Sequence, residues 1–430
     1  MAPKSKMQLK NQHSSNTRWK KSEEIQDDEA NHVQAKHVNP DIAVLSTFIQ
    51  GSNYRRARLG AAVQGNIFPP RSTFYKHQKK IIPQIENQIS SMLAKTSDEA
   101  FDNGCVSLSV DGRYDSCRNA QYCSTSFMDC ANNKVLSIKS VKKSDTNLSS
   151  NMLESTAARK GFDDMVSKYG KKCCSSITTD NDCKTYNQAK ESGLTASRMY
   201  DPRHGIKSLS KSFERISNKM EFDNEFTDAL EGKRLKIVSW GVYLINNIED
   251  IELRGLMWLN SPEHMIGNHQ NCMHGQLPPT HEDWELGIQN PELLEKMRNF
   301  FKRTVSFIKN CEFKNATQCN ESLNNLIAMI APKRLYFSSS YNVRALIAAG
   351  LYNEPHFFSN LLTDLNLDNY VPQEAMEEIK KYESERNEEI EKKRTPQYRK
   401  SKNDYRKKYY SKNKPSKGDY NDDKNDPTFE

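Results

Sequence analysis

The stretch at residues 107–116, SLSVDGRYDS, decides the fold that the sequence predicts. Apolar and serine residues alternate from residue 106 to residue 110, which predicts a β-strand with one buried face. The strand ends at Asp111, directly before a glycine turn. Because Asp-Gly is a common turn pair, this pattern taken alone favours an ordinary turn. A functional role for Asp111 is indicated only if other segments bring carboxylates close to it.

The segments that follow predict two more strands and a helix. Residues 122–128 and 135–141 are rich in aromatic, Thr and β-branched residues, and the short break between them contains Asn, which suits a hairpin. Residues 149–151 are capping candidates for the helix, and Gly170 is its expected stop. The apolar side chains at helical spacing in this helix are Phe162, Met165, Val166 and Tyr169.

Two further strands complete the expected sheet. The segment KKCCSSITTDND (171–182) is a short strand that ends in Asp180 and Asp182, and ASRMYDPRHG (196–205) follows a brief helix. The order strand, strand, strand, helix, strand, helix, strand predicts an α/β domain of the ribonuclease-H-like type. Its first and fourth strands lie side by side in a mixed sheet, and helices cover the faces. Since ligands of open α/β sheets gather at the carboxyl ends of the strands, Asp111 and Asp180 are expected to meet there.

The residues that are not expected to pack into a folded core lie at the two ends of the chain. Only 36% of the 430 residues are apolar, the mean hydropathy is −0.85 and the net charge is +8. Residues 1–39 lack apolar periodicity and are expected to be disordered. Residues 374–430 begin as a charged helix and become a basic tail rich in Tyr, which suits nucleic acid but is also typical of a solvated, disordered tail.

Membrane and secretory classes are not expected. No run of 18 apolar residues occurs, and no apolar segment follows the first lysines, so neither a membrane span nor a signal peptide is predicted. The ten cysteines form no Cys-x-x-Cys pair or regular framework. An intracellular protein with mostly free, buried thiols is therefore expected.

Helical regions flank the first part of the core, residues 104–211. Residues 40–98 favour a plain helical appendage, with a helix-turn-helix DNA-binding region as the alternative. The last helix of this region is expected to be interrupted at Pro83. Residues 212–312 are expected to form a mostly helical insertion.

The region at residues 313–373 is expected to hold the final core helix and further helices. Apolar residues of its first helix recur at i, i+3, i+4 and i+7, namely Leu323, Leu326, Ile327 and Ile330. Pro332 closes the run, and Glu321 lies on the opposite, polar face. A glutamate on a polar helix face is ordinarily just solvated.

Seven stretches, taken in their order, resemble the transposases of eukaryotic cut-and-paste DNA transposons, in particular the Mutator-like and Kolobok-like group. The likeness covers about residues 45–355, and the shared order is more specific than any one segment. The seven stretches are STFYKHQKKIIPQIENQ (72–88), SLSVDGRYDSCRNAQYCSTSFMDCANNKVLSIKSVKK (107–143), NMLESTAARKGF (151–162), TTDNDCKTY (178–186), YDPRHGIKSLSKSF (200–213), IGNHQNCMH (266–274) and NESLNNLIAMIAPKRLYFSSSYNVRALIAAGLYN (320–353).

The resemblance implies a ribonuclease-H-like fold with a helical insertion before its last helix, and a D-D-E catalytic triad. Carried over position by position, the three acids fall on Asp111, Asp180 and Glu321. Asp182 is the rival for the second place, because the family often has two Asp residues two apart there; Asp180 is preferred because it lies directly at the strand end. The implied activity is cleavage of transposon ends and transfer of the freed 3′-hydroxyls to target DNA.

Three converging carboxylates suit Mg²⁺ or Mn²⁺, which prefer oxygen ligands. The positive charge of these ions also reduces the repulsion between the carboxylates and the DNA phosphates. The implied partners are double-stranded DNA, as transposon ends and target, and further copies of the chain on that DNA, in the nucleus. Lys207 and Lys211 are candidates for phosphate contact, with a solvated helix face as an equal alternative. Asn324 could orient Glu321 or contact DNA, or simply belong to a polar helix face.

A second group of residues has zinc-ligand chemistry. His269, Cys272 and His274, with His204 as a further candidate, lie in the stretches that carry the resemblance. His-x-x-Cys spacing can serve Zn²⁺, but a structural site normally needs four ligands, so an ordinary polar loop is favoured. Family members often have Cys-x-x-His where this chain has Asp201-Pro-Arg-His204, and the sequence contains no zinc-ligand pattern near its N-terminus.

Two other functions fit the same residues. One is a transposase-derived protein that a host genome has domesticated, which binds DNA or chromatin without catalysis. The other is a metal-dependent nuclease of the same fold that does not transfer strands. Retention of Asp111, Asp180 and Glu321 favours a catalytic protein.

Overall fold

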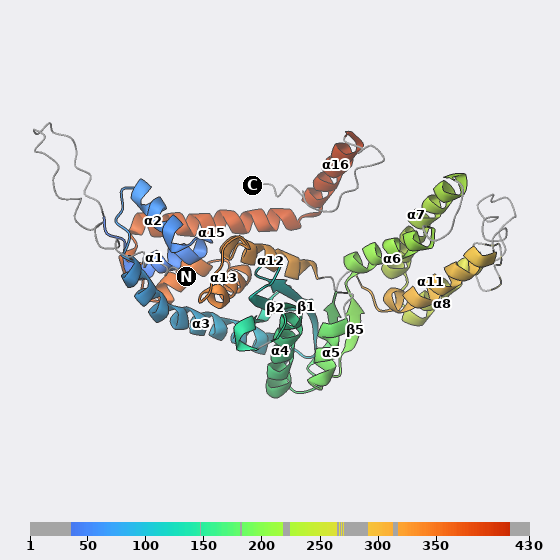
Figure 1. Ribbon diagram of the computed structural model, residues 1–430, viewed down its shortest axis with the longest axis horizontal. Helices are drawn as coiled ribbons and strands as arrows, with labels where there is room; N and C mark the ends of the chain where they lie inside the picture. Colours follow the sequence, from blue (N-terminus) through green and yellow to red (C-terminus); the bar gives the residue numbers. More distant parts are fainter. Residues whose placement is uncertain are drawn as a thin grey trace, which may run out of the picture.

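The computed structural model describes residues 36–146, 148–180, 183–217, 224–264, 266, 268, 270, 291–312 and 317–412. At its centre is a five-stranded mixed sheet in the order β3-β2-β1-β4-β5 (Figure 1). The strands are β1 (Val106–Tyr114), β2 (Tyr122–Asp129), β3 (Val135–Lys142), β4 (Cys174–Thr179) and β5 (Ser197–Tyr200). The first three form an antiparallel meander, and β4 and β5 run parallel to β1. The predicted order of elements and the pairing of the first and fourth strands are confirmed.

Helices α4 (Leu153–Tyr169) and α5 (Cys183–Glu191) lie on one side of the sheet. Phe162 of α4 packs edge-on against Phe127 of β2, with ring centroids 5.2 Å apart. The predicted stop of α4 at Gly170 is confirmed, with φ at +86°. The predicted cap is wrong: residues Ser150–Met152 form a 3₁₀ turn, and no side chain caps α4, because the Ser150 hydroxyl donates to the Ala120 carbonyl instead (3.0 Å).

Helices α12 (Gln318–Ile330) and α13 (Tyr341–Asn353) cover the other side of the sheet. The expectation that β1 has only one buried face is therefore wrong, since Ser109 is 1% exposed. The Ser109 hydroxyl donates to the side-chain oxygen of Asn320 on α12. The amide of Asn320 in turn donates to the Ser126 hydroxyl of β2 (2.9 Å). The alternation in β1 thus separates an apolar from a polar face, and both are buried.

The N-terminal helices share a core with the C-terminal part of the chain. They are α1 (Pro40–Ile49), α2 (Tyr54–Val63) and α3 (Arg71–Asp102), and their apolar residues cluster with those of α12, α13 and α14 (Phe357–Asp364). Arg344 of α13 is buried in this core and donates to the carbonyls of Phe48 (3.0 Å), Ser52 (2.7 Å) and Ile330 (2.6 Å). These bonds to three separate segments hold α1 against α12 and α13.

Helix α3 runs through Pro83 without interruption, so the expected break there is wrong. A proline inside a helix removes one backbone hydrogen bond and crowds the preceding turn. The buried stripe of α3 continues on both sides of the proline, through Ile81, Ile85 and Ile89. Burial of this stripe offsets the lost hydrogen bond. Local helix propensity alone does not include this contribution from packing.

The described residues of the insertion are mostly helical, as predicted. Its helices are α6 (Pro202–Ser217), α7 (Asn224–Asn247), α8 (Ile251–Leu259), α9 (Ser261–His264) and α11 (Pro291–Lys309). They have a core of their own around Trp258, Phe300 and Phe301, beside the sheet in Figure 1. The backbone N–H of Tyr200 donates to the Asn310 carbonyl (2.9 Å), so the two ends of the insertion meet at β5.

Two helices follow α14 at the end of the described chain, α15 (Gln373–Arg394) and α16 (Pro396–Lys412). Helix α15 is attached through Glu383, a buried carboxylate that accepts from the Phe358 N–H (2.6 Å) and the Ser359 hydroxyl (2.8 Å). Helix α16 lies in the segment expected to be a disordered tail. Residues 1–35 and 413–430 are outside the described residues. Within the described chain, no helix combines the length and apolar character needed to cross a membrane.

Candidate active site

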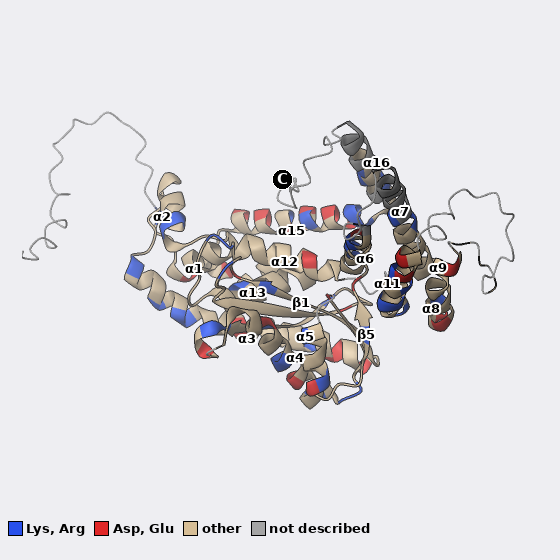
Figure 2. Ribbon diagram, turned by 45° about the vertical axis from the view of Figure 1, so that its right-hand side comes forward, with Lys and Arg blue, Asp and Glu red and all other residues tan. Residues whose placement is uncertain are grey.

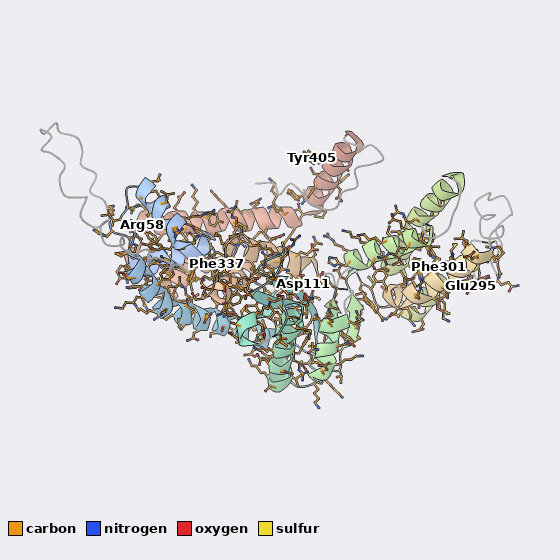
Figure 3. All side chains as sticks on the ribbon, viewed as in Figure 1. Arg58, Asp111, Glu295, Phe301, Phe337 and Tyr405 are labelled. Atoms are coloured by element: carbon orange, nitrogen blue, oxygen red, sulfur yellow. The ribbon has the colours of Figure 1, made fainter. Side chains whose placement is uncertain are left out.

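Two carboxylates lie together where β1 and β4 separate. The parallel pairing of these strands ends at Ser109 and Thr178, so Asp111 and Asp180 each stand two residues beyond the last pair. Figure 3 places Asp111 at the junction of the sheet with α12. Its two oxygens accept from the Gly112 N–H (2.9 Å) and from the Asn324 amide of α12 (2.7 Å). The expected meeting of the first two acids at one sheet edge agrees with this arrangement, while Asp182 lies outside the described residues.

The carboxyl group of Asp111 is strongly perturbed. Burial, followed by the negative charges of Asp180 and Glu154, raises the pKa of Asp111 to about 7. The Gly112 hydrogen bond and the charge of His204 act in the opposite direction but are outweighed. The negative charge of the ionised Asp111 carboxylate is therefore not fully compensated by its surroundings. A proton or a bound cation would compensate it.

Glu321 enters the same site from the first turn of α12. His204 of α6 lies between the second and third acids: its Nδ1 is 2.9 Å from Asp180 Oδ1 and its Nε2 is 3.8 Å from Glu321 Oε1. Arg203 adds a guanidinium 3.7 Å from Glu321 Oε2. The Asp180, His204 and Glu321 side chains are each close to half exposed, so they face solvent from which a substrate can approach.

Asp201 fixes α6 and α12 to one another. It is 1% exposed, and its Oδ1 accepts from the N–H groups of Arg203 (2.8 Å) and His204 (2.9 Å), which caps α6. Its Oδ2 accepts from the N–H (2.7 Å) and the hydroxyl (2.6 Å) of Thr317, the residue that precedes α12. One buried carboxylate thus sets the starting points of the helices that carry His204 and Glu321.

Glu154, in the first turn of α4, is a fourth acid that the sequence did not single out. Its side chain packs against Gly112, where a Cβ would lie 2.4 Å from its Cγ and Cδ. It also hydrogen-bonds the Tyr114 hydroxyl. A Cβ at residue 112 would force the Glu154 side chain to move. The Asp-Gly turn expected from the sequence is wrong, because both residues pair with β2 inside β1. Two signals in the sequence are relevant: an acid at the start of the helix after the third strand, and the Asp-Pro pair that marks Asp201 as a cap.

A cavity of about 440 Å³ borders the site on the Glu154 side. Its lining combines the Glu154 carboxylate with two lysines, Lys184 of α5 and Lys333 after α12, and with the Tyr114 ring. The remaining lining residues are mostly small and polar: Ser116, Cys117, Asn119, Ala120, Ser150, Asn151, Ser155 and Thr185. The cavity therefore combines one negative and two positive side chains.

The donor chemistry of the site fits a hard divalent cation, because Asp111, Asp180 and Glu321 offer carboxylate oxygens and Asp111 lacks a compensating charge. In the described part of the chain, no three His, Cys, Asp or Glu side chains stand close enough together to hold one ion. Asp180 and Glu321 point toward His204 and Arg203 instead, and these half-exposed side chains would have to turn for shared ligation. Asp111, Asp180 and Glu321 are the residues that would hold Mg²⁺ or Mn²⁺.

The other predicted site residues separate into three groups. Asn324 contacts the first acid, Asp111, rather than Glu321. Lys207 and Lys211 are exposed on α6, the helix that carries His204. His269, Cys272 and His274 lie outside the described residues, so of the zinc candidates only His204 is placed, among the acids.

Comparison with protein-family models gives no match for this chain, and comparison with curated proteins gives no significant match.

Proposed function

We propose that the protein is a DNA transposase of the D-D-E type, which cleaves transposon ends and joins them to target DNA with the help of Mg²⁺ or Mn²⁺. The observation that carries the proposal is the gathering of Asp111, Asp180 and Glu321, from β1, β4 and α12, at one edge of the sheet. Three acids from segments up to 210 residues apart in sequence have no evident structural reason to share a half-exposed site. Such a group suits phosphoryl transfer on a polyanion.

The proposed reaction consists of two displacements at phosphorus. In the first, a water oxygen attacks the phosphorus at a transposon end, the bond to the 3′-oxygen breaks, and the 3′-oxygen leaves as a hydroxyl while the water proton goes to a base or solvent. In the second, this 3′-hydroxyl gives its proton to a base or solvent and attacks a target phosphorus, a new phosphodiester forms, and the target 3′-oxygen leaves and takes up a proton from solvent. The divalent ion, when bound, would supply the positive charge that stabilises the entering and leaving oxygens.

The residues of this chain have distinct tasks in that proposal. Asp111, Asp180 and Glu321 hold the charge at the sheet edge, and Asn324 keeps the Asp111 carboxylate oriented through its 2.7 Å bond. Asp201 sets the relative position of α6 and α12, and with it the approach of His204 to Glu321. Lys184 and Lys333, which line the cavity, are assigned to contacts with the DNA backbone.

The test is nicking of supercoiled plasmid in Mn²⁺ by the wild-type chain and by Glu321→Gln, which keeps the side-chain shape and removes its charge. Glu295→Gln, an exposed acid on α11, is the matched control. We expect Glu321→Gln to abolish nicking and the control to retain it. Equal nicking by both variants would refute the assignment of Glu321. Joining of nicked, labelled ends to a second plasmid separates a transposase from a nuclease of the same fold.

A further inference from the structure

The first described helices of the chain carry a large excess of positive charge. Residues 36–85 contain eight Lys or Arg and one acid, Asp41, whereas the whole chain has a net charge of +8. Asp41 is engaged by Lys80 (3.2 Å) and His77 (2.8 Å). The remaining basic side chains of this region are exposed and make no ion pair within the described residues: Lys36, Arg55, Arg56, Arg58, Arg71, Lys76 and Lys79. These seven residues are called the N-terminal basic face below (Figure 2).

Helix α2 presents an unusually large part of its surface to solvent. Only Tyr54, at its first position, is buried, and it packs against Phe74 of α3 with ring centroids 5.2 Å apart. Arg55, Leu59 and Val63 recur at spacings of four, so they form one stripe on the outer side of the helix. Leu59 and Val63 are 66% and 81% exposed. An apolar and cationic stripe of this kind has no partner within the described chain.

The base of α2 is nevertheless rigidly attached. The turn between α1 and α2 contains Gly51, whose φ of +58° favours glycine and whose Cβ, if present, would lie 1.9 Å from the Met329 carbonyl of α12. Arg344 donates to the Ser52 carbonyl in the same turn (2.7 Å). Asn53 caps α2 by accepting from the Arg56 N–H (3.1 Å). The exposed helix is thus fixed to the end of α12, the helix that begins near Glu321.

We propose that the N-terminal basic face binds duplex DNA, with the outer stripe of α2 in the major groove. A helix fixed at its base and free along its outer side fits that groove. Arg55 and Arg56 have the fork of donors that pairs with guanine, and Leu59 and Val63 suit thymine methyl groups. Lys76 and Lys79, on the side of α3 away from its buried stripe, are placed for phosphates.

Duplex DNA is favoured over other polyanions by two features. The apolar side chains among the arginines have no role on a phosphate surface alone but can contact base edges in a groove. The side of α2 that faces outward carries no aromatic ring for stacking single-stranded bases. The inference deepens the proposed function, since a DNA reader attached to α12 would deliver a chosen sequence to the acids of the candidate site.

The test is binding of the full chain to a short fluorescent duplex of random sequence, by fluorescence anisotropy in EDTA over a range of salt concentrations. Arg55→Ala/Arg56→Ala removes the arginine of the outer stripe and its exposed neighbour, and Lys76→Ala/Lys79→Ala removes the two lysines. Lys302→Ala/Arg303→Ala, two exposed cations on α11, is the charge-matched control. All these side chains are exposed, and unchanged circular dichroism will show that the variants fold.

We expect each N-terminal double variant to weaken duplex binding about tenfold or more. The lysine variant should also lower the salt slope by about two units, since each lost phosphate contact changes it by about 0.9. The control should bind as the wild type does. Selection from a random duplex pool should enrich a motif with the wild type, and Arg55→Lys/Arg56→Lys should lose the motif, because lysine lacks the bidentate fork.

The proposal is overturned if the Arg55→Ala/Arg56→Ala chain binds within about twofold of wild type, or if the control weakens binding equally. Tighter binding of single-stranded RNA than of duplex DNA would also overturn it. Because EDTA prevents metal-dependent chemistry, this test is separate from nicking. Glu321→Gln tests nicking in Mn²⁺ and the N-terminal double variants test binding in EDTA, so failure of the catalytic proposal and failure of the binding proposal give different results.

Discussion

The Asp201 carboxylate accepts two hydrogen bonds from Thr317, one from its backbone N–H at 2.7 Å and one from its hydroxyl at 2.6 Å. Asp201→Asn keeps the side-chain shape but replaces one acceptor oxygen by an NH₂ donor. This donor cannot accept hydrogen bonds from the N–H and hydroxyl of Thr317. We expect plasmid nicking to fall at least tenfold and the free energy of unfolding to fall by about 1 to 3 kcal/mol. Nicking assays and urea unfolding measure the two effects.

Thr317→Ser is the control for this positioning residue, because serine retains both donors toward Asp201. It should keep wild-type nicking. If Asp201→Asn lowers stability but leaves kcat and KM unchanged, the role of Asp201 is confined to folding.

Asp111 should make stability depend on pH. Its folded pKa of about 7 lies above the unfolded value near 3.9, so the native state binds more protons than the unfolded state between these values. The Asp111 carboxyl therefore makes the free energy of unfolding fall as the pH rises from about 4 to 7. Asp111→Asn removes this dependence. We compare the free energy of unfolding of Asp111→Asn with that of wild type, by urea unfolding without divalent ions. The difference in favour of the variant should be roughly 2 kcal/mol larger at pH 8 than at pH 5.

Divalent ions should reverse that difference. An ion that binds only the native protein stabilises it by about 2.7 kcal/mol at a hundred times its dissociation constant. Mn²⁺ should therefore raise the unfolding midpoint of the wild type at pH 8 and have little effect on Asp111→Asn or Asp180→Asn. Equal stabilisation of all three proteins would place the bound ion away from these acids.

Glu154→Gln should lower the pKa of Asp111, because it removes one of the two negative charges that raise it. Burial remains, so the pKa should stay above the ordinary value. The pH dependence of Mn²⁺ binding, followed by electron paramagnetic resonance, should move toward lower pH. Glu191→Gln, an exposed acid at the end of α5, should leave the profile in place.

Gly112→Ala tests the contact between Gly112 and Glu154. The new methyl would lie 2.4 Å from the Cγ and Cδ of Glu154, whose flexible side chain can move away, so we expect a stability cost of about 1 kcal/mol. In a Glu154→Ala background most of this cost should disappear, since the obstructing atoms are gone. Additive effects in the double-mutant cycle would show that the two residues do not press on one another.

The sequence predicts the sheet well because its strands carry strong local signals. Alternation in residues 106–110, the Asn-containing hairpin break and the stop at Gly170 each depend on nearby residues only, and the structure agrees with them. The resemblance singles out Asp111, Asp180 and Glu321, which the structure brings to one edge. Glu321 in particular gives no local sign of importance, since a glutamate on a polar helix face is ordinarily solvated.

What the sequence does not predict depends on partners that are distant along the chain. The sequence near Ser109 predicts an open strand face, but α12, more than two hundred residues later in the chain, covers it. Pro83 should interrupt α3, but the core shared with α13 keeps the helix intact. Glu154 is significant only because β1 places Gly112 against it.

The bond from Arg344 to the Phe48 carbonyl joins residues 296 positions apart. Helices α1 and α3 are made early, yet the helices that bury their apolar side chains are made near the end. At ordinary rates of translation, this interval is on the order of tens of seconds. During synthesis, Phe48, Ile81 and Ile85 are therefore uncovered, and the nascent chain is a natural client for chaperones. A chain terminated prematurely before α13 would leave its first helices without a core and become a substrate for proteolysis.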